Sequence, residues 1–144
     1  MSTALPETIE AVKENFSYLD DWSDRYQYLI DLGQKLPPLD DSMKTAANRV
    51  EGCVSQVWMI SRIENDKTNK SIKRFYFIAD SDAHIVKGLI ALLKIIYDGR
   101  PVDEINDIAI APIFEEIGLS DNLLPNRRNG FFAMVERIKT EAAF

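Results

Sequence analysis

The stretch that decides the fold spans residues 72–97 and reads IKRFYFIADSDAHIVKGLIALLKIIY. Residues 72–79 are rich in Ile, Phe and Tyr, which favours a β-strand. Residues 85–97 are apolar around most of a helical circumference, which is typical of a helix buried at the centre of a domain. Between these segments, Asp80-Ser81-Asp82 supplies side chains of the kind that cap helix N-termini. A strand followed at once by a buried helix needs other elements to cover both, and this predicts an α+β domain.

Two further strands are predicted upstream of this stretch. Residues 56–63 are rich in Val, Ile, Trp and Met, and the polar residues 64–71 separate them from the strand at 72–79. This pattern predicts a β-hairpin with a long loop. Residues 48–50 are predicted to form a short preceding strand, which makes residues 51–55 a tight connection. We therefore expect a small antiparallel sheet of about three strands, packed against helices on one face.

Two helices are predicted before the sheet, at residues 9–18 and 22–32. In the second, aromatic and Leu side chains recur at helical spacing, which indicates a face that packs in the core. Gly33 follows directly and is interpreted as the C′ residue that ends this helix. Pro37-Pro38 then enforces an extended segment.

The C-terminal part is predicted to be helical throughout. Gly88 lies inside the central helix, where it costs up to about 1 kcal/mol relative to Ala, so we expect close packing against another backbone at this position. Shorter helices are predicted at 101–106 and 113–117, and a closing helix at 127–143. We find no internal repeat or linker, and residues 1–144 are predicted to form a single domain.

The composition narrows the class of protein. The chain has 144 residues, of which 46% are hydrophobic and 28% charged, as in ordinary soluble domains. The net charge of −6 disfavours nucleic-acid binding, which draws its affinity from clustered cations. No apolar run reaches the roughly 18 residues that a membrane helix needs. The N-terminus lacks the apolar core of a secretory signal, so we expect a cytoplasmic protein without a membrane partner.

The cysteine count is the most restrictive observation. The chain contains one Cys, Cys53, and one His, His84. A single Cys forms neither an internal disulfide nor a C-x-x-C redox pair. Iron–sulfur clusters take about four Cys ligands, and structural zinc takes about four Cys or His ligands. We therefore expect no metal and no cofactor on this chain, and a chemically active Cys53 must react with another molecule.

The residues around Cys53 favour a usable thiol over a packing role. Gly52 can adopt a positive φ, which permits a sharp turn that leaves the next side chain at a loop tip. Arg49 is close enough in sequence to stabilise a thiolate. Lone cysteines are nevertheless usually buried small hydrophobes, so from the local sequence both interpretations stay open.

Four ordered segments resemble the SufE family of sulfur acceptors. Residues 50–58, which read VEGCVSQVW, are similar to the cysteine loop of that family. Residues 22–37 resemble its second helix and the following turn, and residues 80–90 resemble its strand end and central helix. Residues 125–130, which read PNRRNG, resemble the start of its last helix, where an Arg follows a Pro by two residues. The resemblance extends over about residues 22–139.

The resemblance implies an α+β fold related to the NifU-type scaffold proteins, together with a role in iron–sulfur cluster assembly. It implies that the protein accepts a persulfide on Cys53 from a SufS-type cysteine desulfurase and stimulates that enzyme. It also implies that the protein delivers the sulfur to a scaffold that contains a SufB-like subunit. Pyridoxal phosphate is then expected on the desulfurase, and this chain is expected to be a carrier rather than an enzyme. The family likeness leaves both monomer and dimer possible.

The resemblance also nominates supporting residues. Arg127 matches the family's Arg by position and is a candidate for binding an acidic partner surface or a sulfur anion, although a surface charge at a helix start is the simpler interpretation. Arg128 stands where the family pattern has a small polar residue, so either Arg127 or Arg128 can correspond to the family's Arg. Asp82 is a candidate near the Cys loop, with helix capping as the favoured role.

Three other functions remain as alternatives. The first is a CsdE-type partner of a paralogous desulfurase, which shares the fold. The second is a thiol hydrolase or sulfurtransferase in which His84 serves Cys53 as the base. His84 stands where the resembled motif has a small residue, and the sequence supplies no third orienting group, so this enzyme is disfavoured. The third is a binding module in which Cys53 only packs.

Overall fold

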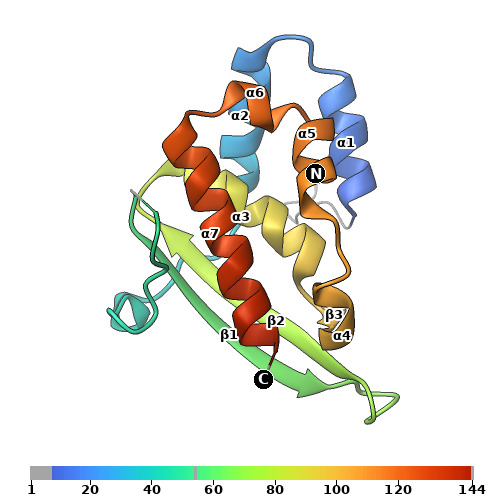
Figure 1. The fold of residues 1–144 in the computed structure, drawn as a ribbon. Coiled ribbons are helices and arrows are strands. Elements are labelled where there is room, and N and C mark those ends of the chain that lie inside the picture. The colour runs from blue at the N-terminus through green and yellow to red at the C-terminus, as the bar shows by residue number, and fades with distance from the viewer. Residues whose placement is uncertain (1–7, 54, 144) are drawn as a thin grey trace.

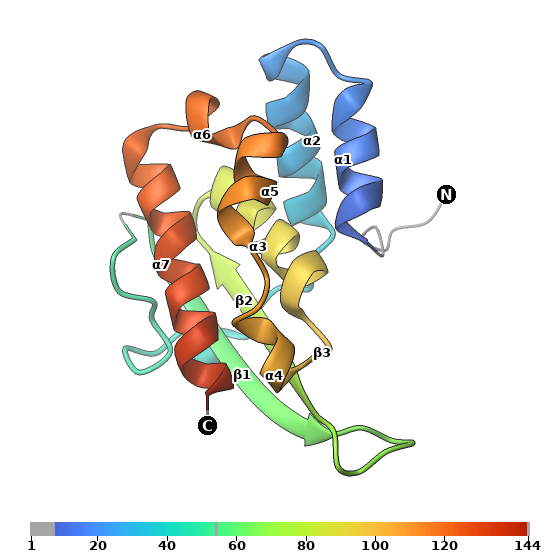
Figure 2. The same cartoon turned by 45° about the vertical axis from the view of Figure 1, so that its right-hand side comes forward.

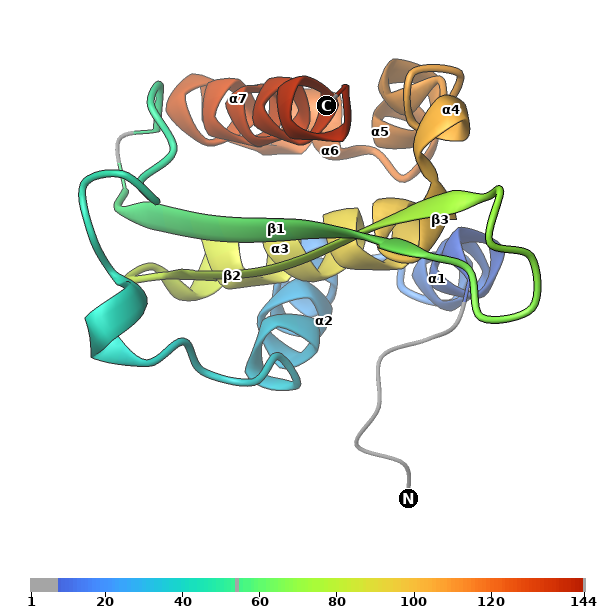
Figure 3. The same ribbon diagram turned by 90° about the horizontal axis from the view of Figure 1, so that it is seen from below.

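The computed structural model describes residues 8–53 and 55–143. The elements follow in the order α1 (Ile9–Ser17), α2 (Trp22–Gln34), the short 3₁₀ helix η1 (Asp41–Met43), β1 (Val57–Asn65), β2 (Lys73–Ser81), α3 (His84–Tyr97), β3 (Arg100–Pro101), α4 (Val102–Ile105), α5 (Ile110–Glu116), α6 (Leu119–Asn122) and α7 (Pro125–Ala142). The helices gather above the sheet (Figure 1). Seen from below, the two long strands cross in front of α3, with α7 to one side and α1 and α2 to the other (Figure 3). The predicted α+β class is confirmed.

The sheet has the strand order β1-β2-β3 and is antiparallel throughout. The long hairpin pairs Val57 with Ser81 at one end and Asn65 with Lys73 at the other. Alternate residues of each strand point toward the helices, as the period of a pleated strand requires. These inward residues are the buried Val57, Met59, Phe75, Phe77 and Ala79.

The third strand lies elsewhere than predicted. Residues 48–50 contribute only an isolated bridge, between Arg49 and Trp58, because the chain enters them from a turn in which the Asn48 amide bonds the Thr45 carbonyl. The third strand is instead β3, directly after α3. Gly99 adopts a φ of +81° there and donates from its amide to the Phe75 carbonyl at 2.7 Å, which brings the chain back along β2.

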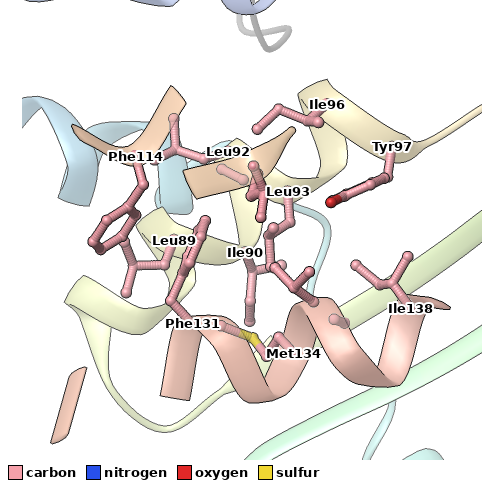
Figure 4. Close-up of a cluster of buried hydrophobic side chains, with 14 of the residues drawn as sticks. Leu89, Ile90, Leu92, Leu93, Ile96, Tyr97, Phe114, Phe131, Met134 and Ile138 are labelled. Atoms are coloured by element: carbon pink, nitrogen blue, oxygen red, sulfur yellow. The ribbon is translucent and has the colours of Figure 1, made fainter. Parts of the chain in front are cut away.

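Helix α3 is the centre of the hydrophobic core. Figures 1 and 2 place it between α7 on one side and the α1–α2 pair on the other. Close up, its apolar side chains meet Phe131, Met134 and Ile138 of α7 and Phe114 of α5 (Figure 4). The buried residues of α3 are Val86, Gly88, Leu89, Ile90, Ala91, Leu92, Leu93, Ile96 and Tyr97. This burial on every side is what the sequence predicted for the segment.

Gly33 has a different role from the predicted C′ position. Helix α2 continues through it to Gln34, with Lys35 as the C-cap. Gly33 lies against α3, where a Cβ atom would stand 2.6 Å from the Gly88 amide nitrogen. A Cβ atom on Gly88 would in turn stand 2.3 Å from the Leu29 carbonyl oxygen. The two glycines therefore let the backbones of α2 and α3 touch, which confirms the close approach predicted at Gly88.

The predicted cap of α3 is also wrong in detail. Strand β2 extends to Ser81, the N-cap residue is Ala83, and no side chain caps the helix. Asp80 instead accepts hydrogen bonds from the Leu39 amide at 3.1 Å and the Ser81 amide at 2.8 Å. Because Asp80 lies within the strand, three residues before the N-cap, its carboxylate binds backbone amides around the strand end and none of the helix. Helices α1 to α5 and α7 each overlap a predicted helical segment, whereas α6 was not predicted.

We predict that Gly88→Ala lowers the free energy of unfolding by about 3 kcal/mol, at the upper end for overpacking, because a methyl group there meets backbone that cannot move aside. Gly130→Ala in α7 is the matched control, since a Cβ there meets its nearest atom, Cys53 Sγ, at an ordinary 3.6 Å. Urea unfolding of both variants measures the difference. A Gly88→Ala protein as stable as Gly130→Ala would contradict the backbone contact.

Candidate functional site

Cys53 lies at the tip of a hairpin loop beside α7. The stem is formed by two hydrogen bonds of 2.8 Å, from the Val50 amide to the Val57 carbonyl and from the Met59 amide to the Asn48 carbonyl. Gly52 adopts a φ of +90°, as the sequence predicted for a sharp turn before Cys53. Because the stem hydrogen bonds fix both ends of the loop, the side chain at its tip is held in a defined place.

One face of α7 forms the surface on which this loop lies. Arg127, Gly130, Met134 and Arg137 follow one another at helical spacing, so they share that face. Gly130 and the neighbouring Ala133 are small, which lets the loop approach. A Cβ atom on Gly52 would stand 3.2 Å from the Ala133 methyl group.

The Cys53 thiol points into the interface and is half-buried. Its S–H group donates to the Gly130 carbonyl oxygen at 3.6 Å. The thiol borders a pocket of about 10 Å³, which is the space of a single water-sized sphere. The pocket is lined by Ser55, Val86, Leu89, Asn126, Arg127, Gly130, Phe131 and Met134. The walls are mostly apolar, and the polar side chains come from the loop and the start of α7.

Burial dominates the electrostatics of the thiol. Removal from water disfavours the thiolate and raises the pKa of Cys53, and the positive charge of Arg49 opposes this by lowering it. The net direction is upward. Arg49 therefore acts on the thiol in the sense that the sequence suggested, but its effect is smaller than that of burial. In this closed arrangement Cys53 is kept as a thiol rather than as the nucleophilic thiolate.

Arg127 connects the loop to the start of α7. Its guanidinium donates to the Ser55 hydroxyl, on the far side of the loop tip from Gly52. The same side chain lines the Cys53 pocket and a neighbouring open groove of about 270 Å³. The remaining residues of this groove are Tyr26, Ile30, Ile85, Leu123 and the 65% exposed Leu124. Arg127 thus stands between the sheltered thiol and an apolar surface open to solvent.

Asp82 fixes the outgoing end of the loop. Its carboxylate accepts a hydrogen bond from the Gln56 amide at 3.0 Å, and its own amide donates to the Gln56 carbonyl at 3.3 Å. The favoured interpretation of Asp82 as a helix cap is therefore wrong, and Asp82 contacts the loop itself. Asp80, which lies two residues earlier at the end of β2, is held by Lys44 and Lys87 at 3.7 and 3.5 Å.

The structure brings most of the predicted site residues together. Cys53 and Gly52 lie in the loop, and Arg127 and Asp82 hold its outgoing half from two different elements. His84 is exposed at the start of α3, and it is absent from the described residues that line the Cys53 pocket. This position gives no support to a Cys–His pair.

Sequence reasoning missed Ser55, Gly130 and Arg137. The helical spacing of Arg127, Gly130 and Arg137 was visible in the sequence, but only the fold reveals that this face of α7 meets the Cys loop. Within residues 8–53 and 55–143, no three His, Cys, Asp or Glu side chains converge as a metal site would require. In the same part of the chain, no helix has the length and apolarity needed to cross a membrane.

Comparison with known proteins gives one consistent family. The family described as "SufE: Fe-S metabolism associated domain" matches residues 10–142. An uncharacterised SufE-like protein of Rhizobium etli is 43% identical over 135 residues, which cover 94% of this chain and 89% of the relative. A second uncharacterised SufE-like protein, from Rhizobium meliloti, is 39% identical over 135 residues, which cover 94% of both chains.

A solved structure shares the fold. The solution structure of a hypothetical protein from Thermus thermophilus aligns with a TM-score of 0.70 and covers 97% of this chain and 96% of its own. The sequence identity is 18%, so this likeness concerns the fold alone.

We predict that the rate of Cys53 alkylation by iodoacetamide rises with pH, with a midpoint above that of an unstructured cysteine peptide, because burial raises the pKa of the thiol. Arg49→Ala should move the midpoint further upward, since the neighbouring cation that lowers this pKa is lost. Arg62→Ala, an exposed position on β1, is the matched control and should leave the midpoint unchanged. A wild-type midpoint at or below that of the peptide would contradict the closed site.

Proposed function

The chain belongs to the SufE family of Fe–S metabolism proteins, and on that premise we propose that it is a sulfur carrier whose acceptor group is Cys53. The observation that supports this role is the placement of the chain's single thiol, at the tip of a stemmed loop against an apolar pocket. A carrier needs one thiol that is reachable when the loop moves and sheltered when it does not. A resolving second Cys would release the sulfur as sulfide, and the chain has none.

The transfer is an exchange between a thiolate and a persulfide. The Cys53 thiolate attacks the terminal sulfur of a persulfide on the partner's cysteine. A new S–S bond forms at Cys53 while the partner's S–S bond breaks, and the partner's cysteine leaves as a thiolate. No net oxidation or reduction occurs, and the persulfide now belongs to Cys53. The product is passed on by the same exchange toward an acceptor thiol.

The closed loop has to open for this exchange. The Cys53 thiol is half-buried and faces Gly130 and a pocket with room for one water-sized sphere, which leaves no space in that pocket for a protein-bound persulfide. Leaving the pocket also removes the burial that raises the pKa of the thiol, and the nearby Arg49 then favours the thiolate. In our proposal the loop movement therefore provides access and reactivity in one step.

Arg127 is proposed to serve the open state. When the loop leaves, the bond between the Arg127 guanidinium and the Ser55 hydroxyl breaks. A guanidinium released at the rim of an apolar groove can pair with a carboxylate of the partner or with the sulfur anion. This assigns Arg127 a contact in each state of the loop.

The partners proposed here follow the family. The donor is a SufS-type cysteine desulfurase, which carries the pyridoxal phosphate and which this chain stimulates by removing the persulfide from it. The recipient is a scaffold with a SufB-like subunit that assembles iron–sulfur clusters. The chain itself is proposed to act in the reducing cytoplasm, without catalysing a reaction alone and without a cofactor of its own.

We predict that incubation with a SufS-type desulfurase and free cysteine adds the mass of one sulfur atom to the intact protein. The addition should be reversed by reductant, as expected for a persulfide. Cys53→Ser should abolish it while leaving the fold unchanged. Intact-mass spectrometry measures the addition, and the alanine formed from cysteine in the same samples reports stimulation of the desulfurase.

The double variant Cys53→Ser with Ser55→Cys is the matched control, because it keeps one thiol in the lining of the same pocket but moves it from the Gly130 carbonyl to the side of the loop that faces Arg127. We expect it to accept sulfur at least about tenfold more slowly than the wild type, since misplaced reacting groups lose the benefit of orientation. Normal sulfur relay by Cys53→Ser would exclude Cys53 as the acceptor.

A further inference from the structure

The segment 47–50, which leads into the Cys53 loop, has one edge bridged to β1 and one edge turned toward α7. Asn48 and Val50 hydrogen-bond to β1, and Arg49 forms the bridge to Trp58 between them. In an antiparallel pair, successive residues direct their backbone groups to opposite sides, so the Arg49 carbonyl faces away from β1. A free edge of this kind frays or pairs elsewhere unless another group covers it.

Arg137 of α7 covers this edge. Its guanidinium donates through Nη1 to the Arg49 carbonyl at 3.1 Å and through Nη2 to the Ala47 carbonyl at 3.2 Å. The planar, forked guanidinium can reach two carbonyls at once, which a Lys side chain cannot do with the same geometry. Arg137 thus takes the place of a neighbouring strand for the segment that carries the loop.

The Arg137 side chain is itself held in place. Its Nε donates to Glu141 at 2.6 Å, one helical turn along α7, and the side chains are only 26% and 20% exposed. Glu141 also accepts a hydrogen bond from the Ser61 hydroxyl of β1. A continuous network therefore runs from β1 through Glu141 and Arg137 to the segment 47–50 before Cys53.

We propose that Arg137 is a positioning residue for Cys53, which clamps the segment 47–50 that leads into the Cys53 loop onto α7 and so sets how readily the thiol leaves its pocket. This proposal rests on the proposed function only in treating Cys53 as the reacting group. Arg137 is not among the described residues that line the pocket, and it acts through the Ala47 and Arg49 carbonyls.

Arg127 and Arg137 hold different parts of the loop and behave differently when the loop opens. Arg127 binds Ser55, beyond the loop tip, and that bond has to break when Cys53 moves out. Arg137 binds the stem, so its bonds persist while the loop tip swings. Helix α7 thus carries one arginine that releases and one that holds, about three helical turns apart on the same face. Loss of the second should let the stem fray, and Cys53 should then be exposed without a partner.

The test is native-state alkylation of Cys53 by iodoacetamide at fixed pH in the full-length protein. Arg137→Ala should be alkylated about tenfold faster than the wild type, because charge-assisted hydrogen bonds of this strength shift an opening equilibrium by about that factor. Amide exchange at Val50 should accelerate in parallel, while amides of α3 keep their wild-type rates. Arg137→Lys should return the alkylation rate to within about threefold of the wild type, since it restores a charged donor.

The matched control is Lys139→Ala, which removes a cation two residues further along α7 and leaves the clamp intact. Should Arg137→Ala fail to fold, Arg137→Gln carries the same comparison, because its amide cannot bridge both carbonyls. A folded Arg137→Ala or Arg137→Gln protein with wild-type alkylation would overturn the proposal, as would equal acceleration in Lys139→Ala. These assays contain no desulfurase, so their outcome is separate from whether Cys53 accepts sulfur.

Discussion

The burial of α3 is the constraint on which the rest of the structure depends. A helix apolar on nearly every side loses stability wherever it meets water, so each side needs a cover. The sheet covers one side and α7 another, and α2 approaches so closely that the contact is made through Gly33 and Gly88. Because α7 packs against both α3 and β1, the loop that directly precedes β1 lies beside α7. The position of Cys53 is thus a consequence of how the core is covered.

The stability of the loop is of a different order from that of the core. Besides packing, its tip is held by an S–H bond to Gly130, the bond from Arg127 to Ser55 and the bond from the Gln56 amide to Asp82. Each contributes about 1 kcal/mol, or somewhat more where a charge takes part. Their sum is smaller than the roughly 5–15 kcal/mol of a whole domain, so the tip can open while the core remains folded. A carrier that alternates between sheltering and presenting one thiol requires this separation.

The sequence predicted what depends on composition and periodicity. The fold class, the hairpin, the central helix and the sharp turn at Gly52 were all predicted, because apolar periodicity and glycine conformation are local signals. The sequence missed β3, the interhelical role of Gly33 and the contact of Asp82 with the loop, because these depend on where distant segments meet. Arg137 was missed for the same reason, since no local pattern distinguishes it from an ordinary helix-surface charge. The chemical roles of the site residues remain predictions for experiment.

Cys53 is proposed to react from an opened loop above an intact stem. Amide hydrogen exchange with and without a SufS-type desulfurase measures this most directly, at two amides with different partners. The Gln56 amide donates to Asp82 at the loop's outgoing end, and the Val50 amide donates to Val57 within the stem. We expect the desulfurase to accelerate exchange at Gln56 and to leave Val50 protected. Unchanged or slower exchange at Gln56 in a complex shown to transfer sulfur would contradict this opening.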